Sequence, residues 1–438
     1  MRVYAGIDLG STTTKAVILD EAGEVLGRGI TNSRSSYDLA ARIAGEEARL
    51  AARFTLLDRE LGADADLAAH SERLRGQLLT RFRHDQELAQ LEALRELLLE
   101  EAASPRLGNL SGPLQERVKA IADEMLAMER KPRLELVKKK TSDFFRDRAA
   151  STFGRLAEAR ADQAVKFGDL LGVFDKAILR VENTSFDLGF EDRLRAAARD
   201  VAASLSGPLR ASCVAAVERT VAQPLDEVRV IGTGYGRARL PFPKANIRSE
   251  ILCHGLGAHA QFPGTRTVLD IGGQDTKAIQ VDADGIVTSF QMNDRCAAGC
   301  GRYLGYIADE MSLGVHELGP LAQTSTRTVR ITSTCTVFAG AELRDRLGNG
   351  QRREDILAGL HRAVILRAMA LLARSGGVAD EFTFTGGVAN NAAAVDALTK
   401  LVRESYGERR LNISAGSIYT GALGAAIFAM RAGPEAEA

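Results

Sequence analysis

The sequence predicts an α/β protein built from two related strand–turn–strand units, with a large all-helical insertion inside the first part. One unit contains Asp8 and the other Asp270. Both read as an apolar strand, an aspartate, an apolar residue, a glycine, a polar turn, a threonine and a lysine. Between them lies a long stretch rich in Ala, Leu, Arg and Glu, with apolar residues at helical spacing. At 438 residues, the chain is long enough for two or three domains.

The composition limits the kinds of partner that we expect. Lys plus Arg equals Asp plus Glu at 57 each, so no net charge attracts nucleic acid or an anionic membrane. No apolar run reaches the roughly 18–20 residues that span a bilayer, and the N-terminus lacks a secretory pattern. We therefore expect a cytosolic protein, where clustered cysteines more often hold metal or do chemistry than form disulfides.

The opening of the chain predicts an antiparallel meander, with strands at 3–7, 16–19 and 25–29. Between the first two strands, Gly10 is followed by Ser11, Thr12 and Thr13, and then by Lys15. Backbone N–H groups, hydroxyls and the lysine can surround an anion at such a turn. A tight hairpin without a ligand is the alternative for this turn alone.

From Tyr37 to about residue 207, the pattern predicts a helical bundle or long helical hairpins. Helical stretches are expected at 114–128, 153–181 and 191–205, with breaks near Pro105, 108–113 and Pro132. The charges of this insertion are mixed in sign, which is typical of a solvated surface. It carries no recognisable chemistry, and we expect a docking role.

The α/β pattern resumes after Pro208, with a helix at 211–221, a strand at 228–231 and the turn GTGYG at 232–236. Cys213 is in phase with apolar residues of its helix and is predicted to lie in the core. Cys253 lies beside His254 on a predicted helix; packing is the simpler interpretation, and metal binding is the alternative.

The second unit follows the strand at 267–271 and repeats the first. Two such turns can face one polyphosphate from opposite sides, with Asp8 and Asp270 holding Mg²⁺ directly or through water. Later, a helix is expected at 354–373, a strand at 381–384 and a final helix at 416–431. The glycines of the turn TGGVANN, Thr385–Asn391, permit close approach of a flat or charged ligand.

The two matched turns and the late TGGVANN turn resemble the actin, sugar-kinase and heat-shock ATPase superfamily, in which two similar domains close over ATP. More narrowly, four segments are similar to the activase family that includes the 2-hydroxyacyl-CoA dehydratase activators and the ATPase subunits of ATP-dependent benzoyl-CoA reductase. They are Asp270–Lys277, Asn293–Gly299, Ser333–Ala339 and Thr385–Asn391. The resemblance covers about the first thirty residues and the region from near Ser206 to the end.

This resemblance implies four segments along the chain. Residues 1–36 are expected to begin ATPase domain I, 37–207 to form the helical insertion, 208–266 to complete domain I, and 267–438 to form domain II with the cluster-binding helices.

The turns and the resemblance together imply the ATP ligands. One side is expected to use Gly10, Ser11, Thr12, Thr13 and Lys15; the other side is expected to use Asp270, Gly272, Gly273, Gln274 and Asp275. Gly386, Gly387 and Asn390 are expected near the nucleoside. Asp8 and Asp270 are the expected Mg²⁺ carboxylates, and Asp8, Gln274 and Asp275 are unranked candidates to orient the water for hydrolysis.

In the activase family, one cysteine from each of two motifs binds a [4Fe–4S] cluster, and a second subunit supplies the other two. Carried over to this chain, these ligands are Cys296 and Cys335, each just before a predicted helix whose N–H groups and dipole favour negative charge. Cys300 stands where the activators have a threonine, and is expected to pack or to lie beside the cluster. A zinc site and an ATPase without metal are the alternatives.

The length and the insertion resemble the larger ATPase subunit of benzoyl-CoA reductase. That resemblance implies a smaller homologous ATPase subunit that shares the cluster, two reductase subunits, and reduced ferredoxin as the electron donor. ATP turnover is then expected to drive electrons to the reductase subunits, which reduce the ring of benzoyl-CoA. The first alternative is a homodimeric activator of a 2-hydroxyacyl-CoA dehydratase, and the second is a kinase or chaperone-like ATPase without a cluster.

Overall fold

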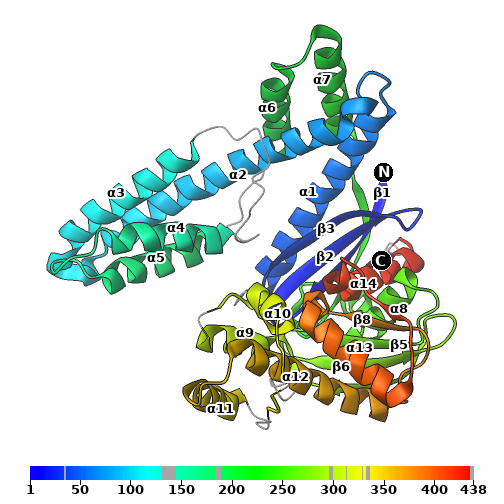
Figure 1. The fold of residues 1–438 in the computed structure, drawn as a ribbon. Coiled ribbons are helices and arrows are strands. Elements are labelled where there is room, and N and C mark those ends of the chain that lie inside the picture. Colours follow the sequence, from blue (N-terminus) through cyan, green and yellow to red (C-terminus); the bar gives the residue numbers. More distant parts are fainter. Residues whose placement is uncertain are drawn as a thin grey trace. The chain divides into compact units, whose positions relative to one another are not determined.

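The computed structural model describes residues 1–33, 36–130, 145–182, 189–294, 299–311, 313–327, 329–331 and 336–434. The chain forms two compact units (Figure 1). Unit 1 comprises Met1–Ala51 and Leu225–Ala438, and unit 2 comprises Ala52–Pro224. Unit 2 is thus an insertion between two parts of unit 1.

The first sheet of unit 1 has four strands in the order β3-β2-β1-β4. Its strands are β1 (Arg2–Leu9), β2 (Thr13–Asp20), β3 (Val25–Asn32) and β4 (Asp226–Thr233). The first three form an antiparallel meander, and β4 pairs with β1 in parallel. After its first residue β1 is buried throughout, as expected of a strand that is covered on both faces.

Helices cover both faces of this sheet at very short distances. An added Cβ at Gly29 would overlap the backbone of Ala44 in α1 (Tyr37–Ala63), and one at Gly6 would overlap that of Ala422 in α14 (Thr420–Ala432). Glycine is required because a side chain at these two positions would push the helices away. Helix α8 (Glu250–Gln261) packs beside α14.

The second sheet of unit 1 has five strands in the order β7-β6-β5-β8-β9. They are β5 (Thr267–Ile271), β6 (Thr276–Val281), β7 (Val287–Asn293), β8 (Phe382–Thr385) and β9 (Leu411–Asn412). As in the first sheet, three strands form an antiparallel meander, and the first of them also pairs in parallel with a later strand. The predicted repeat of the strand–turn–strand unit is therefore also a repeat of sheet topology.

Besides α8, which also packs on this sheet, five described helices share a core beside the second sheet. They are α9 (Gly301–Glu310), α10 (Val315–Gln323), α11 (Thr336–Gly348), α12 (Arg353–Ser375) and α13 (Ala392–Tyr406). A large apolar core joins them to β5 and β8 and includes Leu269, Tyr303, Leu360 and Phe384. By length and composition alone α12 could cross a membrane, but most of it is buried in this core.

Unit 2 is all-helical in its described residues. Besides the end of α1, it contains α2 (Ser71–Ala102), α3 (Ser111–Glu129), α4 (Phe145–Glu158), α5 (Phe167–Glu182), α6 (Phe190–Ala202) and α7 (Gly207–Ala222). Helices α2 to α5 share an apolar core of their own, in which the rings of Phe153 and Phe174 stack with centroids 4.6 Å apart. The insertion thus has the internal core of an independent module.

Most predicted elements are confirmed, and three details differ. The stretch predicted as helical over 153–181 is two helices, because residues 159–166 form the turn between α4 and α5. The unit boundaries lie at residues 52 and 224, beyond the predicted 37 and 207, because α1 begins on the first sheet and continues into the insertion. The last helix, placed with domain II from the sequence, packs against the first sheet.

Candidate functional site

The turn between β1 and β2 carries the first half of the predicted site. Asp8 and Lys15 are register partners across the two strands, and Lys15 Nζ lies 3.3 Å from Asp8 Oδ2. The other oxygen, Asp8 Oδ1, is buried without a hydrogen-bond partner. An orphaned buried oxygen is costly unless a ligand satisfies it, so this carboxylate fits a position that faces Mg²⁺ or its water.

The turn between β5 and β6 repeats this arrangement. Asp270 and Lys277 are register partners, and Lys277 Nζ lies 3.2 Å from Asp270 Oδ2. The same ammonium lies 2.9 Å from Asp275 Oδ1 and 2.9 Å from Glu250 Oε1. The sequence repeat is therefore a repeated cross-strand ion pair, to which the second copy adds two carboxylates.

Asp270 differs from Asp8 because the protein satisfies both of its oxygens. Thr385 Oγ1 donates to Asp270 Oδ1 over 2.8 Å, His254 Nδ1 forms an ion pair with the same oxygen at 3.2 Å, and Lys277 binds the other. Burial alone would raise the pKa of Asp270, but His254 and Lys277 hold that pKa far below its usual range. The geometry favours contact with Mg²⁺ through water over direct binding at this residue.

Three residues of this cluster were not among the predicted site residues: Glu250, His254 and Lys277. Burial raises the pKa of Glu250 in spite of Lys277, whereas Asp270 raises the pKa of His254 in spite of burial. Glu250 and His254 are four residues apart at the start of α8, and so share one helix face. The available signal was an acidic residue and a histidine at this spacing, at the start of the first α-helix after the GTGYG turn.

The two phosphate-type turns lie against each other. An added Cβ at Gly273 would overlap Thr12 Oγ1, so the tips of the two turns are in contact. Thr12 is exposed, and Ser11, Gly272, Gly273 and Gln274 are partly exposed. The structure thus brings together the predicted phosphate residues as a rim above the buried ion-pair cluster.

The third predicted turn follows β8, beside the second. Gly386 has φ +86° and packs so tightly on the backbone of Ile271 that only glycine fits. The Ser417 hydroxyl contacts the backbone oxygen of Gly386, and it lies 3.4 Å from the side-chain oxygen of Asn390. Gly387 and Asn390 are exposed. This turn has the open face that a nucleoside would need.

Helix α9 is hydrogen-bonded directly to the second phosphate-type turn. The Gly301 N–H donates to Gly272 O over 2.8 Å, and the Arg302 N–H donates to Gly273 O over 2.7 Å. These two N–H groups are therefore used within the protein, and are not available to a cluster as the sequence had suggested for this helix start. Instead, these backbone bonds join the turn directly to the start of α9.

Helices α9 and α11 run parallel and in register. Gly340 packs on the Tyr306 hydroxyl, and Arg344 forms an ion pair with Glu310. In the first contact, Tyr306 lies five residues after the start of α9 and Gly340 four residues after the start of α11. In the second contact, Glu310 lies nine residues after the start of α9 and Arg344 eight residues after the start of α11. The first described residues of the two helices therefore lie at the same end of the pair.

The predicted cluster ligands themselves, Cys296 and Cys335, lie outside the described residues. Among the residues that the structure describes, no group of three or more His, Cys, Asp and Glu side chains is arranged to hold a metal ion. Mg²⁺ needs no such group, because it is usually bound by one or two carboxylates together with phosphates and water.

The other cysteines pack in cores. Cys213 and Cys253 are fully buried, and burial raises the pKa of Cys253 to about 12. Cys300, extended at the residue before α9, is buried in the core of the second sheet. Packing is thus the interpretation that the structure supports for Cys213, Cys253 and Cys300.

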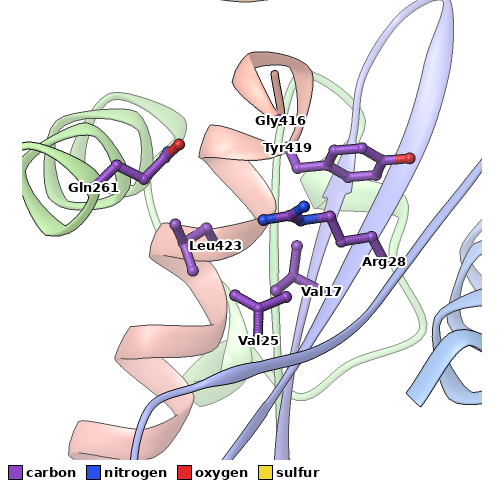
Figure 2. Close-up of a pocket in the computed structure, with 7 residues that line it drawn as sticks. All are labelled: Val17, Val25, Arg28, Gln261, Gly416, Tyr419 and Leu423. Carbon is purple, nitrogen blue, oxygen red and sulfur yellow. The ribbon is translucent and has the colours of Figure 1, made fainter. Parts of the chain in front are cut away.

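A separate small hollow lies between β2, β3 and the start of α14 (Figure 2). In it, the guanidinium carbon of Arg28 lies 5.9 Å from the centre of the Tyr419 ring. The hollow is lined by Val17, Val25, Arg28, Gln261, Gly416, Tyr419 and Leu423. None of these is a predicted site residue or a carboxylate, so this hollow is distinct from the ATP site.

Comparison with known proteins decides the family. The model of the BadF/BadG/BcrA/BcrD ATPase family matches residues 5–429, nearly the whole chain. The chain belongs to this ATPase family. Within the family, it is similar to the (R)-2-hydroxyglutaryl-CoA dehydratase activating ATPase of Acidaminococcus fermentans, with 42% identity over 231 residues that cover 53% of this chain and 86% of that one.

Two further relatives place the two predicted branches of the family side by side. The activator of lactoyl-CoA dehydratase of Anaerotignum propionicum is 39% identical over 242 residues, 55% of this chain and 90% of that protein. A benzoyl-CoA reductase subunit of Thauera aromatica is 31% identical over 203 residues, 45% of this chain and 70% of that protein. Similarity is thus higher to the dehydratase activators, the alternative of the sequence analysis.

Solved structures confirm the predicted actin, sugar-kinase and heat-shock ATPase-like fold class. Component A of the Acidaminococcus fermentans (R)-2-hydroxyglutaryl-CoA dehydratase has a TM-score of 0.53 at 23% identity, with 99% of both chains covered. The activator of the 2-hydroxyisocaproyl-CoA dehydratase from Clostridium difficile with bound ADPNP has a TM-score of 0.51 at 22% identity, with 98% of this chain and 95% of that chain covered.

The length of unit 1 agrees with that of an activator in this ATPase family. Unit 1 holds the first 51 residues and the last 214, which makes 265 without the insertion. The 231 residues aligned with the Acidaminococcus ATPase are 86% of that protein, whose length is therefore about 269 residues. Unit 1 thus has about the length of the Acidaminococcus ATPase, and this chain carries unit 2 in addition.

Proposed function

We propose that this chain is an ATP-hydrolysing activator of a 2-hydroxyacyl-CoA dehydratase, which drives an electron into its partner enzyme by turnover of ATP. The observation that carries this proposal is the 42% identity to a dehydratase-activating ATPase, against 31% to a benzoyl-CoA reductase subunit. The paired Asp–Lys turns of unit 1 supply the chemistry that ATP hydrolysis needs.

The chain's own residues have distinct tasks in this hydrolysis. The bond between the terminal phosphorus and its bridging oxygen breaks, a water oxygen bonds to that phosphorus, and a proton leaves the water. Lys15 and the turn at Gly272–Gln274 hold the phosphates in line. When bound, Mg²⁺ neutralises phosphate charge, and Asp8 is our first candidate to hold it or its water, because Asp8 Oδ1 lacks a protein partner.

We rank the three predicted water-orienting residues by their contacts. Asp275 Oδ1 is held at 2.9 Å by Lys277 as part of the second-turn cluster, so we rank it below the other two. Gln274 is partly exposed and can orient a water but cannot accept its proton. We assign the proton to Asp8 Oδ1, which lacks a protein partner, so that Asp8 contacts Mg²⁺ through water and not directly.

A [4Fe–4S] cluster bound by Cys296 and Cys335 with two cysteines of a partner chain would, when bound, carry the electron. The support from the described residues is the common end of α9 and α11, and the backbone bonds from Gly272 and Gly273 to α9. In this proposal, an ATP-dependent shift of the turn would reach the start of α9 through these bonds, and α11 through its contacts with α9.

The larger ATPase subunit of benzoyl-CoA reductase is the second candidate, and unit 2 is the observation that favours it. In that case the partners are a smaller homologous ATPase subunit and two reductase subunits, with ferredoxin as the donor. A kinase or chaperone-like ATPase without a cluster is the third candidate, and iron in the purified protein would exclude it.

Anaerobic purification of the full chain from its own source, with subunit and iron analysis, distinguishes these candidates. We expect a homodimer with about four iron atoms, separate from the dehydratase that it activates. Fixed co-purification with a smaller homologous ATPase and two reductase subunits would overturn the proposal in favour of the second candidate. An iron-free protein that phosphorylates a small alcohol would overturn both.

A further inference from the structure

The turn after β4 has no role in the function proposed so far. It carries the sequence GTGYGRAR, Gly232–Arg239, and ends in the short 3-10 helix η3 (Arg237–Arg239). We propose that its residues Gly234–Arg237 form a further wall of the ATP site, and that Arg237 is a further catalytic residue that contacts the terminal phosphate. This inference rests on the ATPase activity within the proposed function, not on the identity of the electron acceptor.

The turn is fixed against the catalytic end of β1. Gly234 has φ +96°, and an added Cβ would lie 2.6 Å from Leu9 O and closer still to Asp8 Oδ1. The Gly236 N–H donates to Leu9 O over 3.0 Å. Because two glycines allow this approach, the turn lies in contact with the carboxylate that we assign to Mg²⁺ and its water.

The side chain of Arg237 lies next to the buried carboxylate cluster. Its Nη1 donates to Gly234 O over 3.0 Å and lies 3.9 Å from Glu250 Oε2. Glu250 is in turn bound to Lys277 at 2.9 Å. The guanidinium is therefore next to the carboxylate cluster, and its side chain is 42% exposed while that of Glu250 is 9% exposed. It lies where the cluster opens to solvent.

Most of the hydrogen-bonding capacity of Arg237 is available to a ligand. A guanidinium has five N–H donors, and the contacts that the structure gives this one involve Nη1 alone. The 3.9 Å contact with Glu250, on a partly exposed side chain, contributes little to stability. A bidentate phosphate contact would use the remaining donors in the geometry for which arginine is suited.

The charge of the site requires such a cation. Among the described residues, the side chains of Asp8, Glu250, Asp270 and Asp275 pair with Lys15, Lys277 and His254, so these cations are already engaged by the protein. A polyphosphate brings several more negative charges. In phosphoryl transfer, charge on the equatorial oxygens of the moving phosphoryl group is stabilised by cations, including arginine.

Arg239 is a matched control in the same short helix. Its guanidinium carbon lies 5.5 Å from the centre of the Tyr37 ring, and the residue is exposed. The two arginines are separated by one residue, but the structure gives only Arg237 a contact with the carboxylate cluster. The two substitutions remove the same charge from the same element.

The test measures ATP turnover and nucleotide affinity of the full chain, without any dehydratase. For Arg237→Met we expect turnover to fall about 100-fold. Its affinity for a non-hydrolysable Mg–ATP analogue is expected to fall about tenfold, with its affinity for Mg–ADP unchanged within about twofold, because ADP lacks the terminal phosphate. Arg239→Met is expected to match the wild type within about twofold. If Arg237→Met does not fold, Arg237→Lys keeps the charge and is expected to lose about tenfold in turnover.

Three results would overturn the inference. The first is wild-type turnover in the folded Arg237 variant. The second is an equal loss of affinity for Mg–ADP and the ATP analogue in that variant, which would indicate that the turn is merely structural. The third is a loss of turnover in Arg239→Met that equals the loss in Arg237→Met. A wild-type chain that hydrolyses ATP but activates no dehydratase would refute the proposed function and leave the assignment of Arg237 standing. A wild-type chain that binds no ATP would refute this inference as well.

Discussion

Asp8 and Asp270 occupy equivalent positions at the ends of β1 and β5, and each lies opposite a lysine on the next strand. Their surroundings differ. Asp8 has one oxygen without a partner, whereas Asp270 has Thr385, His254 and Lys277 around it. At this scale the repeat has diverged into one carboxylate with an oxygen that lacks a protein partner and one whose two oxygens are both bound by the protein.

Substitution of the two aspartates should therefore have opposite effects on activity and stability. Asp8→Asn is expected to lower ATP turnover about 100-fold or more with little change in unfolding, because Lys15 is partly exposed and can be hydrated. Asp270→Asn leaves Lys277 and His254 buried without their shared partner and should cost about 3–5 kcal/mol. Urea unfolding and phosphate release measure the two effects, and an Asp270→Asn variant as stable as the wild type would contradict this assignment.

The ion pair between His254 and Asp270 predicts a pH dependence of stability. Burial lowers the pKa of His254, but Asp270 outweighs burial and raises it above the unfolded value of about 6.5. The stabilisation is therefore fully present below about pH 6.5 and is lost as the pH rises through the folded pKa. The free energy of unfolding should exceed that of His254→Gln at pH 6, with a difference that narrows toward pH 9. A difference that widens with rising pH would contradict the pair.

At the scale of elements, close packing of helices on the first sheet should make Gly6 intolerant of a side chain. Gly6→Val forces β1 away from the backbone of α14, and overpacking of this kind costs about 1–3 kcal/mol or more. Gly305→Ala in α9 is the matched control, because nothing lies within 4 Å of its added Cβ and alanine favours the helix by about 1 kcal/mol. Thermal unfolding should show that Gly6→Val is less stable than Gly305→Ala. Equal stability of the two variants would contradict the close packing of α14 on β1.

Elements were predictable from the sequence where the signal was local. The apolar strands before Asp8 and Asp270, and the glycine turns after them, have periods and turn residues that act within a few positions. The contacts of α8 were not predictable in this way. Glu250 and His254 meet Lys277 and Asp270 through the packing of α8 on a second sheet, and no local pattern records which helix face meets which strand.

The start of unit 2 could not be placed from the sequence for a related reason. One continuous helix, α1, packs its beginning on the first sheet and ends in unit 2, so no change of composition marks residue 52. The cluster ligands Cys296 and Cys335 remain predictions from family resemblance. The contacts between α9 and α11 were not foreseen.

At the scale of the whole molecule, the insertion should be dispensable for ATP turnover. It leaves and re-enters unit 1 at neighbouring points, because Arg49 and Glu227 form an ion pair at 2.7 Å. A chain in which a short glycine linker joins Ala51 to Leu225 keeps both turns and the full core of unit 1. We expect its turnover to stay within about fivefold of the wild type, a small change on the scale on which tenfold is 1.36 kcal/mol.

The same deletion tests the role of unit 2 in partner choice. We expect the shortened chain to lose binding to its partner enzyme, which pull-down under anaerobic conditions measures. The Arg95→Met variant, which removes a surface ion pair with Asp123 inside unit 2, is the control for nonspecific surface change. Retained partner binding by the shortened chain would exclude a docking role for the insertion.

The most direct test of the central claim is ATP-dependent activation of a 2-hydroxyacyl-CoA dehydratase by the anaerobically purified chain, with a chemical reductant present. The account predicts dehydration of the 2-hydroxyacyl-CoA only when both ATP and the reductant are added, and no dehydration with Asp8→Asn. Steady ATP hydrolysis without activation of the dehydratase, under conditions in which the chain holds its iron, would contradict the account.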